Sequence, residues 1–182
     1  MKYVTSLFMI SLICLFSCSN DGDSAGNDPP VMNEEELKRV TMLIDPAPKT
    51  YQEDQVNKLI QYALDHDWPV HKTGSGLLYW IRKQGDDSQV KKDDTVQVRY
   101  KGNLIDGKIF DQSPPSGEPA EFNVRSVIPA WQEALSLIGE GGQIVILAHS
   151  DLAYRGRRMG NAIPPYSPLI FEIELINVNI RD

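Results

Sequence analysis

Residues 96–111 constrain the fold more than any other part of this chain. Apolar side chains alternate with polar ones along the first half of the segment, in the order Val96, Gln97, Val98, Arg99, Tyr100, Lys101. This period of two is typical of a β-strand that buries one face. An Asp-Gly pair at residues 106–107 then marks a tight turn, and a second apolar stretch ends on Phe-Asp at residues 110–111. The segment therefore predicts an antiparallel hairpin.

The remainder of the C-terminal half is also rich in β-type residues. We predict further strands at 77–82, 120–124, 143–149 and 169–179, in addition to those at 95–103 and 108–111. Only residues 129–138 have helical character, with Pro129 suited to the first turn and Gly139 to the stop. The sequence thus predicts an α+β fold, in which a small antiparallel sheet wraps around one short helix.

Five ordered blocks in this half resemble the FKBP-type peptidyl-prolyl cis-trans isomerases. After the hairpin these are Val-Ile-Pro-Ala-Trp at 127–131, Ala-Tyr at 153–154, Ala-Ile-Pro-Pro at 162–165 and Leu-Ile-Phe-Glu-Ile-Glu-Leu at 169–175. They occur in the order and nearly at the spacing of the family. The resemblance implies an isomerase domain over residues 75–182, preceded by a helical N-terminal extension over residues 34–74.

The same resemblance implies an aromatic pocket for a prolyl ring. The residues carried over for contact with the rotating amide and the ring are Asp111, Tyr154, Ile128 and Trp131. Those carried over as substrate-binding walls are Tyr100, Phe110, Phe122, Val127, Ile163 and Phe171, with Ile163 closing the far rim. The implied reaction needs no cofactor, its substrates are proline-containing polypeptides, and macrolide-type inhibitors would fit the pocket.

Three departures from the family pattern bear on activity. Pro129-Ala130 replaces the usual Arg-Gly before the tryptophan, and residues 112–119 lack a basic partner for the aspartate. Residues 155–158 carry three arginines, which indicate either a preference for acidic or phosphate-bearing partners or simply a solvated loop. These departures keep a second reading open, a low-turnover chaperone or binding module for Pro-containing segments within an envelope assembly. A structural envelope lipoprotein is a third.

The N-terminus has the features of an exported protein. Residues 1–17 hold Lys2 and an apolar run from 7 to 16, as in a signal peptide. Leu-Phe-Ser-Cys at 15–18 resembles a bacterial lipobox, which implies acylation of Cys18 and a lipid-anchored protein of the cell envelope, at the outer membrane. The alternative is an ordinary secretory signal. Residues 18–33 are mostly Asp, Gly, Asn, Ser and Pro with little to bury, so they predict a flexible tether.

Two helices are expected in the extension. Residues 34–44 predict a short helix capped by Asn33 and stopped by Pro46. A second helix is predicted over 52–66, with an apolar stripe at 56, 59, 60, 63 and 64. That stripe needs a partner, either the domain that follows, which we favour, or a second copy of the chain. We expect a fragment of residues 70–182 to isomerise Xaa-Pro peptides without these helices.

Charge and cysteine content exclude several other classes of protein. The net charge of −7 argues against nonspecific nucleic-acid binding, which depends on a basic surface. Both cysteines, Cys14 and Cys18, lie at the signal, so the body of the mature chain after Cys18 has none for a disulfide or a nucleophile. The three histidines (66, 71 and 149) lack metal-ligand spacing, and we predict no metal site.

Overall fold

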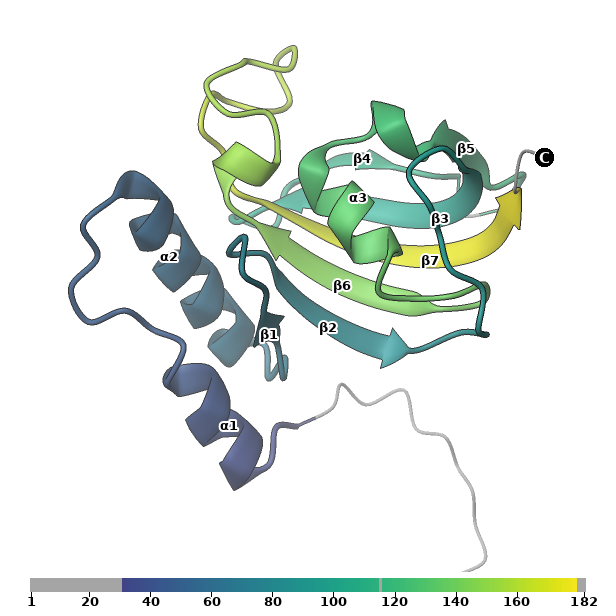
Figure 1. The fold of residues 1–182 in the computed structure, drawn as a ribbon. Coiled ribbons are helices and arrows are strands. Elements are labelled where there is room, and N and C mark those ends of the chain that lie inside the picture. Colours follow the sequence, from purple (N-terminus) through teal and green to yellow (C-terminus); the bar gives the residue numbers. More distant parts are fainter. Residues whose placement is uncertain (1–30, 115, 180–182) are drawn as a thin grey trace, which may run out of the picture.

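The computed structural model describes residues 31–114 and 116–179 of the 182-residue chain. Two helices precede a seven-stranded antiparallel sheet whose strand order is β1-β2-β6-β7-β3-β4, with β5 paired to β3 (Figure 1). This arrangement confirms the predicted α+β fold. The helices are α1 (Glu34–Thr41), α2 (Tyr51–Asp65) and α3 (Pro129–Leu135), with the 3₁₀ turns η1 (Val124–Ser126) and η2 (Ser150–Leu152). The strands are β1 (His71–Lys72), β2 (Leu78–Lys83), β3 (Thr95–Leu104), β4 (Ile109–Gln112), β5 (Ala120–Asn123), β6 (Gln143–Ala148) and β7 (Leu169–Asn179).

Both N-terminal helices begin with a capping box. The Asn33 side chain accepts from the Glu36 backbone N–H at 2.9 Å, and the Glu36 carboxylate accepts from the Asn33 N–H at 3.1 Å. Thr50 and Glu53 make the same reciprocal pair at the start of α2. These bonds satisfy amides that a helix cannot pair internally. The predicted cap at Asn33 is confirmed, although α1 ends at Thr41, earlier than expected.

The alternation that opens β3 puts its apolar side chains on the face that holds α3. Val96 and Val98 are fully buried, and the sheet face they share packs against Ala130, Trp131 and Leu135 of α3. Strand β3 pairs with β7 along its whole length, from Thr95 opposite Asn179 to Leu104 opposite Leu169. The concave side of the sheet therefore forms one core with the short helix, and the pocket described below opens at the edge of this core.

Helix α2 covers the opposite face of the same sheet (Figure 1). Leu59, Ile60 and Ala63 are fully buried against a group of sheet residues. That group comprises Leu78, Val145, Leu147 and Ile170. Because both of its faces are covered, β6 is apolar almost continuously, as is usual for doubly covered strands. The apolar stripe of α2 thus docks on the domain that follows it.

Two local predictions from the sequence differ from the structure. No strand was predicted at residues 71–72, yet β1 pairs with β2 there, so the sheet begins inside the segment assigned to the extension. Helix α3 ends at Leu135 with Ser136 as its C-cap, not at Gly139. Gly139 has another role, because a Cβ at this position would lie 2.0 Å from the Asp86 carbonyl oxygen. This close backbone approach needs a residue without a side chain.

The predicted signal peptide, Cys18 and the tether as far as residue 30 lie outside the described residues. Within residues 31–179, apart from residue 115, no helix is both long and apolar enough to cross a membrane.

Candidate active site

An apolar cavity of about 180 Å³ opens between the sheet and the start of α3. Strands β3, β4, β5 and β7 contribute side chains to it, together with the segment before α3 and the loop after η2. Its lining residues are Tyr100, Phe110, Asp111, Phe122, Ser126, Val127, Ile128, Trp131, Tyr154 and Phe171. Binding sites for whole drug-sized ligands typically measure roughly 300 to 1,000 Å³, so this cavity suits a single ring or side chain.

Trp131 lines this cavity and is 4% exposed. Its ring makes edge-to-face contacts with Tyr100, Phe122 and Phe171, at centroid distances of 5.2, 5.5 and 5.5 Å. Phe110 stands edge-on to Phe171 at 5.5 Å. Aromatic pairs prefer such perpendicular arrangements, and the mutual contacts hold the rings in place. The cavity therefore has a rigid aromatic floor and walls.

Gly102 of β3 makes room for two of these rings. A Cβ added at this position would lie 2.6 Å from Phe110 Cζ and 3.0 Å from Phe171 Cε1. Atoms cannot approach so closely without displacement of one ring. Gly102 is opposite Phe171 on β7 and Asp111 on β4. A glycine at this point in the strand therefore allows the aromatic walls to close over the backbone.

Polar groups gather at the mouth of the cavity. The Tyr100 hydroxyl donates to Asp111 Oδ2 at 2.8 Å, and Asp111 itself is exposed to solvent. Burial, the hydrogen bond to Asp111 and its negative charge together raise the pKa of Tyr100 well above its usual value. Burial, with a contribution from the Asp111 charge, also raises the pKa of Tyr154. Both phenols therefore keep their protons at neutral pH and can act as donors.

Buried Ser113 fixes the backbone of Tyr100. Its hydroxyl accepts from the Tyr100 N–H at 3.0 Å and lies 3.3 Å from the Tyr100 carbonyl oxygen, to which the Ser113 N–H also donates at 3.0 Å. Without the serine hydroxyl, the Tyr100 N–H would lose this partner at the point where β4 ends. The position of the Tyr100 ring thus depends on a residue that the sequence did not single out.

The segment 127–128 forms a wall with a free backbone donor. Ile128 is the N-cap of α3, and the Gln132 side chain donates to the Val127 carbonyl at 2.9 Å, which holds the segment against the helix. The Ile128 N–H has no acceptor among the described residues. An unpaired amide on the wall of an apolar cavity is available to a ligand carbonyl.

Comparison with known proteins agrees with this geometry. Residues 86–176 match the FKBP-type peptidyl-prolyl cis-trans isomerase domain. The chain belongs to this family. It is 44% identical over 109 residues to the probable FKBP-type peptidyl-prolyl cis-trans isomerase FkpA of Neisseria meningitidis, covering 60% of this chain and 40% of that protein. It is 45% identical over 109 residues to the FKBP-type 22 kDa isomerase of Escherichia coli, covering 60% of this chain and 53% of that one.

Solved structures of FKBP relatives have the same fold. The crystal structure of FkpA from Escherichia coli superposes with a TM-score of 0.62 at 34% identity, covering 80% of this chain and 63% of that one. A peptidyl-prolyl cis-trans isomerase from Pseudomonas syringae gives 0.56 at 32% identity, covering 85% of this chain and all of that one. The chain spans only about half the length of the curated relatives it matches.

Nine of the ten pocket residues carried over from the FKBP family line the cavity. Ile163 does not. It is 5% exposed, belongs to the same buried cluster as Trp131 and Phe171, and its backbone pairs with Met159. The structure adds Ser126 to the lining, next to the predicted wall. The expectation that Ile163 closes the rim is therefore not supported by the lining, and the roles of the other nine toward a substrate remain predictions.

The other departures noted in the sequence can be placed in this FKBP-type domain. Ala130 is fully buried behind the cavity, and the arginines at 155, 157 and 158 are exposed. In the described ranges, no carboxylate lies within ion-pair distance of these arginines, and no basic side chain lies within ion-pair distance of Asp111. The described residues also contain no group of three His, Cys, Asp or Glu side chains placed to hold a metal ion.

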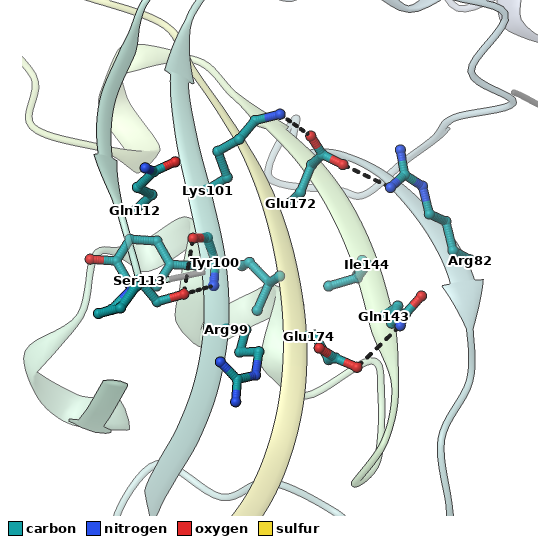
Figure 2. A pocket seen from close by; sticks show the side chains of 12 residues that line it. Arg82, Arg99, Tyr100, Lys101, Gln112, Ser113, Gln143, Ile144, Glu172 and Glu174 are labelled. Atoms are coloured by element: carbon teal, nitrogen blue, oxygen red, sulfur yellow. Dashed lines mark hydrogen bonds and ion pairs between the residues drawn. The ribbon is translucent and has the colours of Figure 1, made fainter. Parts of the chain in front are cut away.

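A larger hollow of about 380 Å³ lies on the outer face of the sheet (Figure 2). Its charged groups are largely paired with one another. Glu172 bonds both Arg82 at 2.7 Å and Lys101 at 2.9 Å, and Gln143 donates to Glu174 at 3.2 Å. Burial alone would raise the pKa of Glu172, but the hydrogen bonds from Lys101 and Arg82 outweigh it and lower this pKa. This surface is a polar part of the sheet face that α2 leaves uncovered. Aromatic side chains do not surround it, as they do the FKBP cavity.

Proposed function

We propose that this protein is a peptidyl-prolyl cis-trans isomerase acting on Xaa-Pro bonds of exported or envelope proteins. The observation that carries the proposal is the aromatic cavity around Trp131. Asp111 and Tyr154 lie at its mouth, and the Ile128 N–H on its wall has no acceptor among the described residues. Family membership over residues 86–176 supports the same activity. The reaction needs no covalent chemistry and no cofactor.

The physical problem is the barrier to rotation about the prolyl amide, roughly 18 to 20 kcal/mol. Amide resonance is lost in the twisted state, so the carbonyl is less polar and the nitrogen lone pair is localised. A catalyst must bind this state better than either planar form. An apolar cavity favours the less polar state, because removal from water penalises it less than the planar amides.

Each polar group at the mouth has a proposed task. The Trp131 floor and the surrounding rings hold the prolyl ring, while the Ile128 N–H donates to a substrate carbonyl and fixes one side of the bond. Tyr154, whose proton is held more tightly because burial raises its pKa, donates to the other side. The Asp111 carboxylate faces the carbonyl group of the rotating amide. The hydrogen bond from the Tyr100 hydroxyl sets the orientation of this carboxylate.

The experiment is an exchange measurement on Xaa-Pro peptides with the purified mature chain, by two-dimensional NMR or a protease-coupled assay. We expect a catalysed rate that is highest for bulky apolar residues before proline. A chain that is folded by circular dichroism but gives no rate above the uncatalysed exchange would refute the isomerase. Binding of the same peptides without turnover would then favour the chaperone or binding-module alternative.

We further propose that the protein is anchored in the cell envelope through an acyl group on Cys18. One relative, 46% identical over 104 residues that cover 57% of this chain and 45% of that protein, is the outer membrane protein MIP of Legionella longbeachae. The Leu-Phe-Ser-Cys motif at residues 15–18 supports the lipid, and residues 18–33 would act as the tether. Intact-mass analysis of the mature form tests the proposal, with Cys18→Ser expected to release the protein from membranes. A membrane-bound form without acyl mass would contradict it.

A further inference from the structure

The loop between β6 and β7 carries Tyr154 into the cavity, and its two ends meet at a narrow neck. We call Ser150, Arg155 and Tyr166 the loop neck. The Arg155 N–H donates to the Ser150 carbonyl at 2.8 Å, and the Tyr166 N–H donates to the Arg155 carbonyl at 2.7 Å. Arg155 and Tyr166 have φ angles of +53° and +60°, a region that non-glycine residues adopt rarely and at a cost. Surrounding contacts must hold this conformation.

One side chain from α2 bonds both strands of the loop neck. The Gln55 carbonyl oxygen Oε1 accepts from the Ser150 N–H at 2.8 Å, and Gln55 Nε2 donates to the Tyr166 carbonyl at 2.7 Å. Gln55 is 2% exposed, while every other fully or nearly fully buried side chain of α2 is apolar. A buried amide is stable only when its polar atoms are paired. The buried Gln55 side chain therefore links α2 to the loop neck through two hydrogen bonds.

The first turn of α2 adds weaker contacts to the same region. The Tyr51 hydroxyl lies 3.4 Å from the Tyr166 carbonyl oxygen, and the two rings stand edge to face at 6.0 Å. Gln52 Nε2 lies 3.1 Å from Nε2 of His149, a residue that is 1% exposed and directly precedes η2. The N-terminal half of α2 thus contacts the base of the loop at several points, and Gln55 is the buried one.

Arg155 of the loop neck directly follows Tyr154, whose side chain lines the cavity. We propose that Gln55 is a positioning residue for the isomerase site, which it serves by tying α2 to the loop that carries Tyr154. This inference rests on the proposed function. It makes the N-terminal extension part of the catalytic unit. The 70–182 fragment lacks Gln55 and exposes the sheet face that α2 covers, so we now expect it to be less active than the full mature chain.

The test uses the full mature chain with two substitutions at Gln55. Gln55→Met keeps the length of the side chain and removes both hydrogen bonds, whereas Gln55→Glu keeps an acceptor for the Ser150 N–H and loses the donor to Tyr166. Gln61→Met is the matched control, because Gln61 is an exposed glutamine of α2 that bonds only Asp65 of the same helix. Circular dichroism melts set an assay temperature at which every variant is folded.

We expect kcat/KM to fall about fivefold to tenfold in Gln55→Met, since positioning of a substrate-contacting group is weakened. The fall should be at least as large in Gln55→Glu, because its buried carboxylate would face the Tyr166 carbonyl oxygen. Gln61→Met should remain within about twofold of the wild type. Amide hydrogen exchange should accelerate at Ser150, Arg155 and Tyr166 in the Gln55 variants and stay unchanged in the paired strands β6 and β7. A purely structural role would instead lower protection throughout the sheet.

The outcomes separate this inference from the proposed function. An active wild type with unchanged kcat/KM in both Gln55 variants overturns the positioning role and leaves the isomerase standing. Unchanged exchange at the loop neck overturns it as well. If the wild type itself shows no isomerase activity, the proposed function fails, and the exchange data alone decide whether Gln55 orders the Tyr154 loop. If Gln55→Met and Gln55→Glu do not fold, Gln55→Asn carries the same comparison, because it keeps a neutral amide that is too short to reach both Ser150 and Tyr166.

Discussion

The hydrogen bond between Tyr100 and Asp111 allows the proposed site to be tested by the removal of a single hydroxyl group. Tyr100→Phe removes only the hydroxyl group that donates to Asp111 at 2.8 Å. The ring itself keeps its edge-to-face contacts with Trp131 at 5.2 Å and with Phe122 at 5.8 Å. Ser113 still holds the backbone of residue 100. We therefore expect a folded variant whose Asp111 carboxylate has lost its orienting partner.

The size of the effect follows from the surroundings of the bond. A hydrogen bond to a charged group contributes about 1.5 to 3 kcal/mol when its partners cannot be replaced by water. Asp111 is exposed, so water takes the place of the missing hydroxyl and the loss is smaller. We take about 1 kcal/mol, which corresponds to roughly a fivefold decrease in kcat/KM.

A double-mutant cycle measures this coupling. Peptide kcat/KM is determined for the wild type, Tyr100→Phe, Asp111→Asn and the double variant, with Tyr79→Phe as a control outside the cavity. Because Tyr100 is assigned to act through Asp111, the double variant should be about as slow as Asp111→Asn alone. Additive losses, or a Tyr100→Phe variant as fast as the wild type, would refute the reasoning.

Three further predictions follow from the packing and the charges. The lowered pKa of Glu172 means that its ion pairs stabilise the fold fully above its unfolded pKa, about 4.3, and less as pH falls through the folded value. The urea midpoint of Glu172→Gln should therefore approach that of the wild type between about pH 5 and pH 3, and a difference that does not change with pH would contradict this reasoning. The raised pKa values of Tyr100 and Tyr154 predict a kcat/KM that does not decline between pH ~7 and ~10, and a fall in this range would contradict their role as donors. Gly102→Ala should lower the free energy of unfolding by about 1 to 3 kcal/mol together with peptide kcat/KM, because its Cβ displaces Phe110 or Phe171, and an unchanged urea midpoint would show that the rings yield freely.

Features that depend on neighbours along the chain could be predicted from the sequence. The alternation in β3, the Asp-Gly turn and the Asn33 cap each depend on a few consecutive residues, and each is where it was expected. The aromatic cavity was also predictable, but through the order of its motifs in the FKBP family. Its residues come from segments as far apart as Tyr100 and Phe171, which no local period relates.

Other features depended on contacts between distant elements. Gln55 appeared to be an ordinary polar residue beside the apolar stripe of α2, because only the docked helix brings it to Ser150 and Tyr166. Ser113 has a local sequence without any special signal, and its importance comes from the Tyr100 backbone. Gly102 is a glycine inside a strand pattern, which indicates a bulge or a close approach, but only the structure shows that two rings on other strands are what approaches it. Ile163 kept the family motif and still lies in the buried cluster outside the cavity lining. The sequence by itself thus determined the period, the turns and the kinds of side chain available, since these depend on local backbone preference. Only the tertiary structure decided which polar groups find buried partners, because a hydrogen bond depends on the distance between atoms that can be a hundred residues apart in the chain.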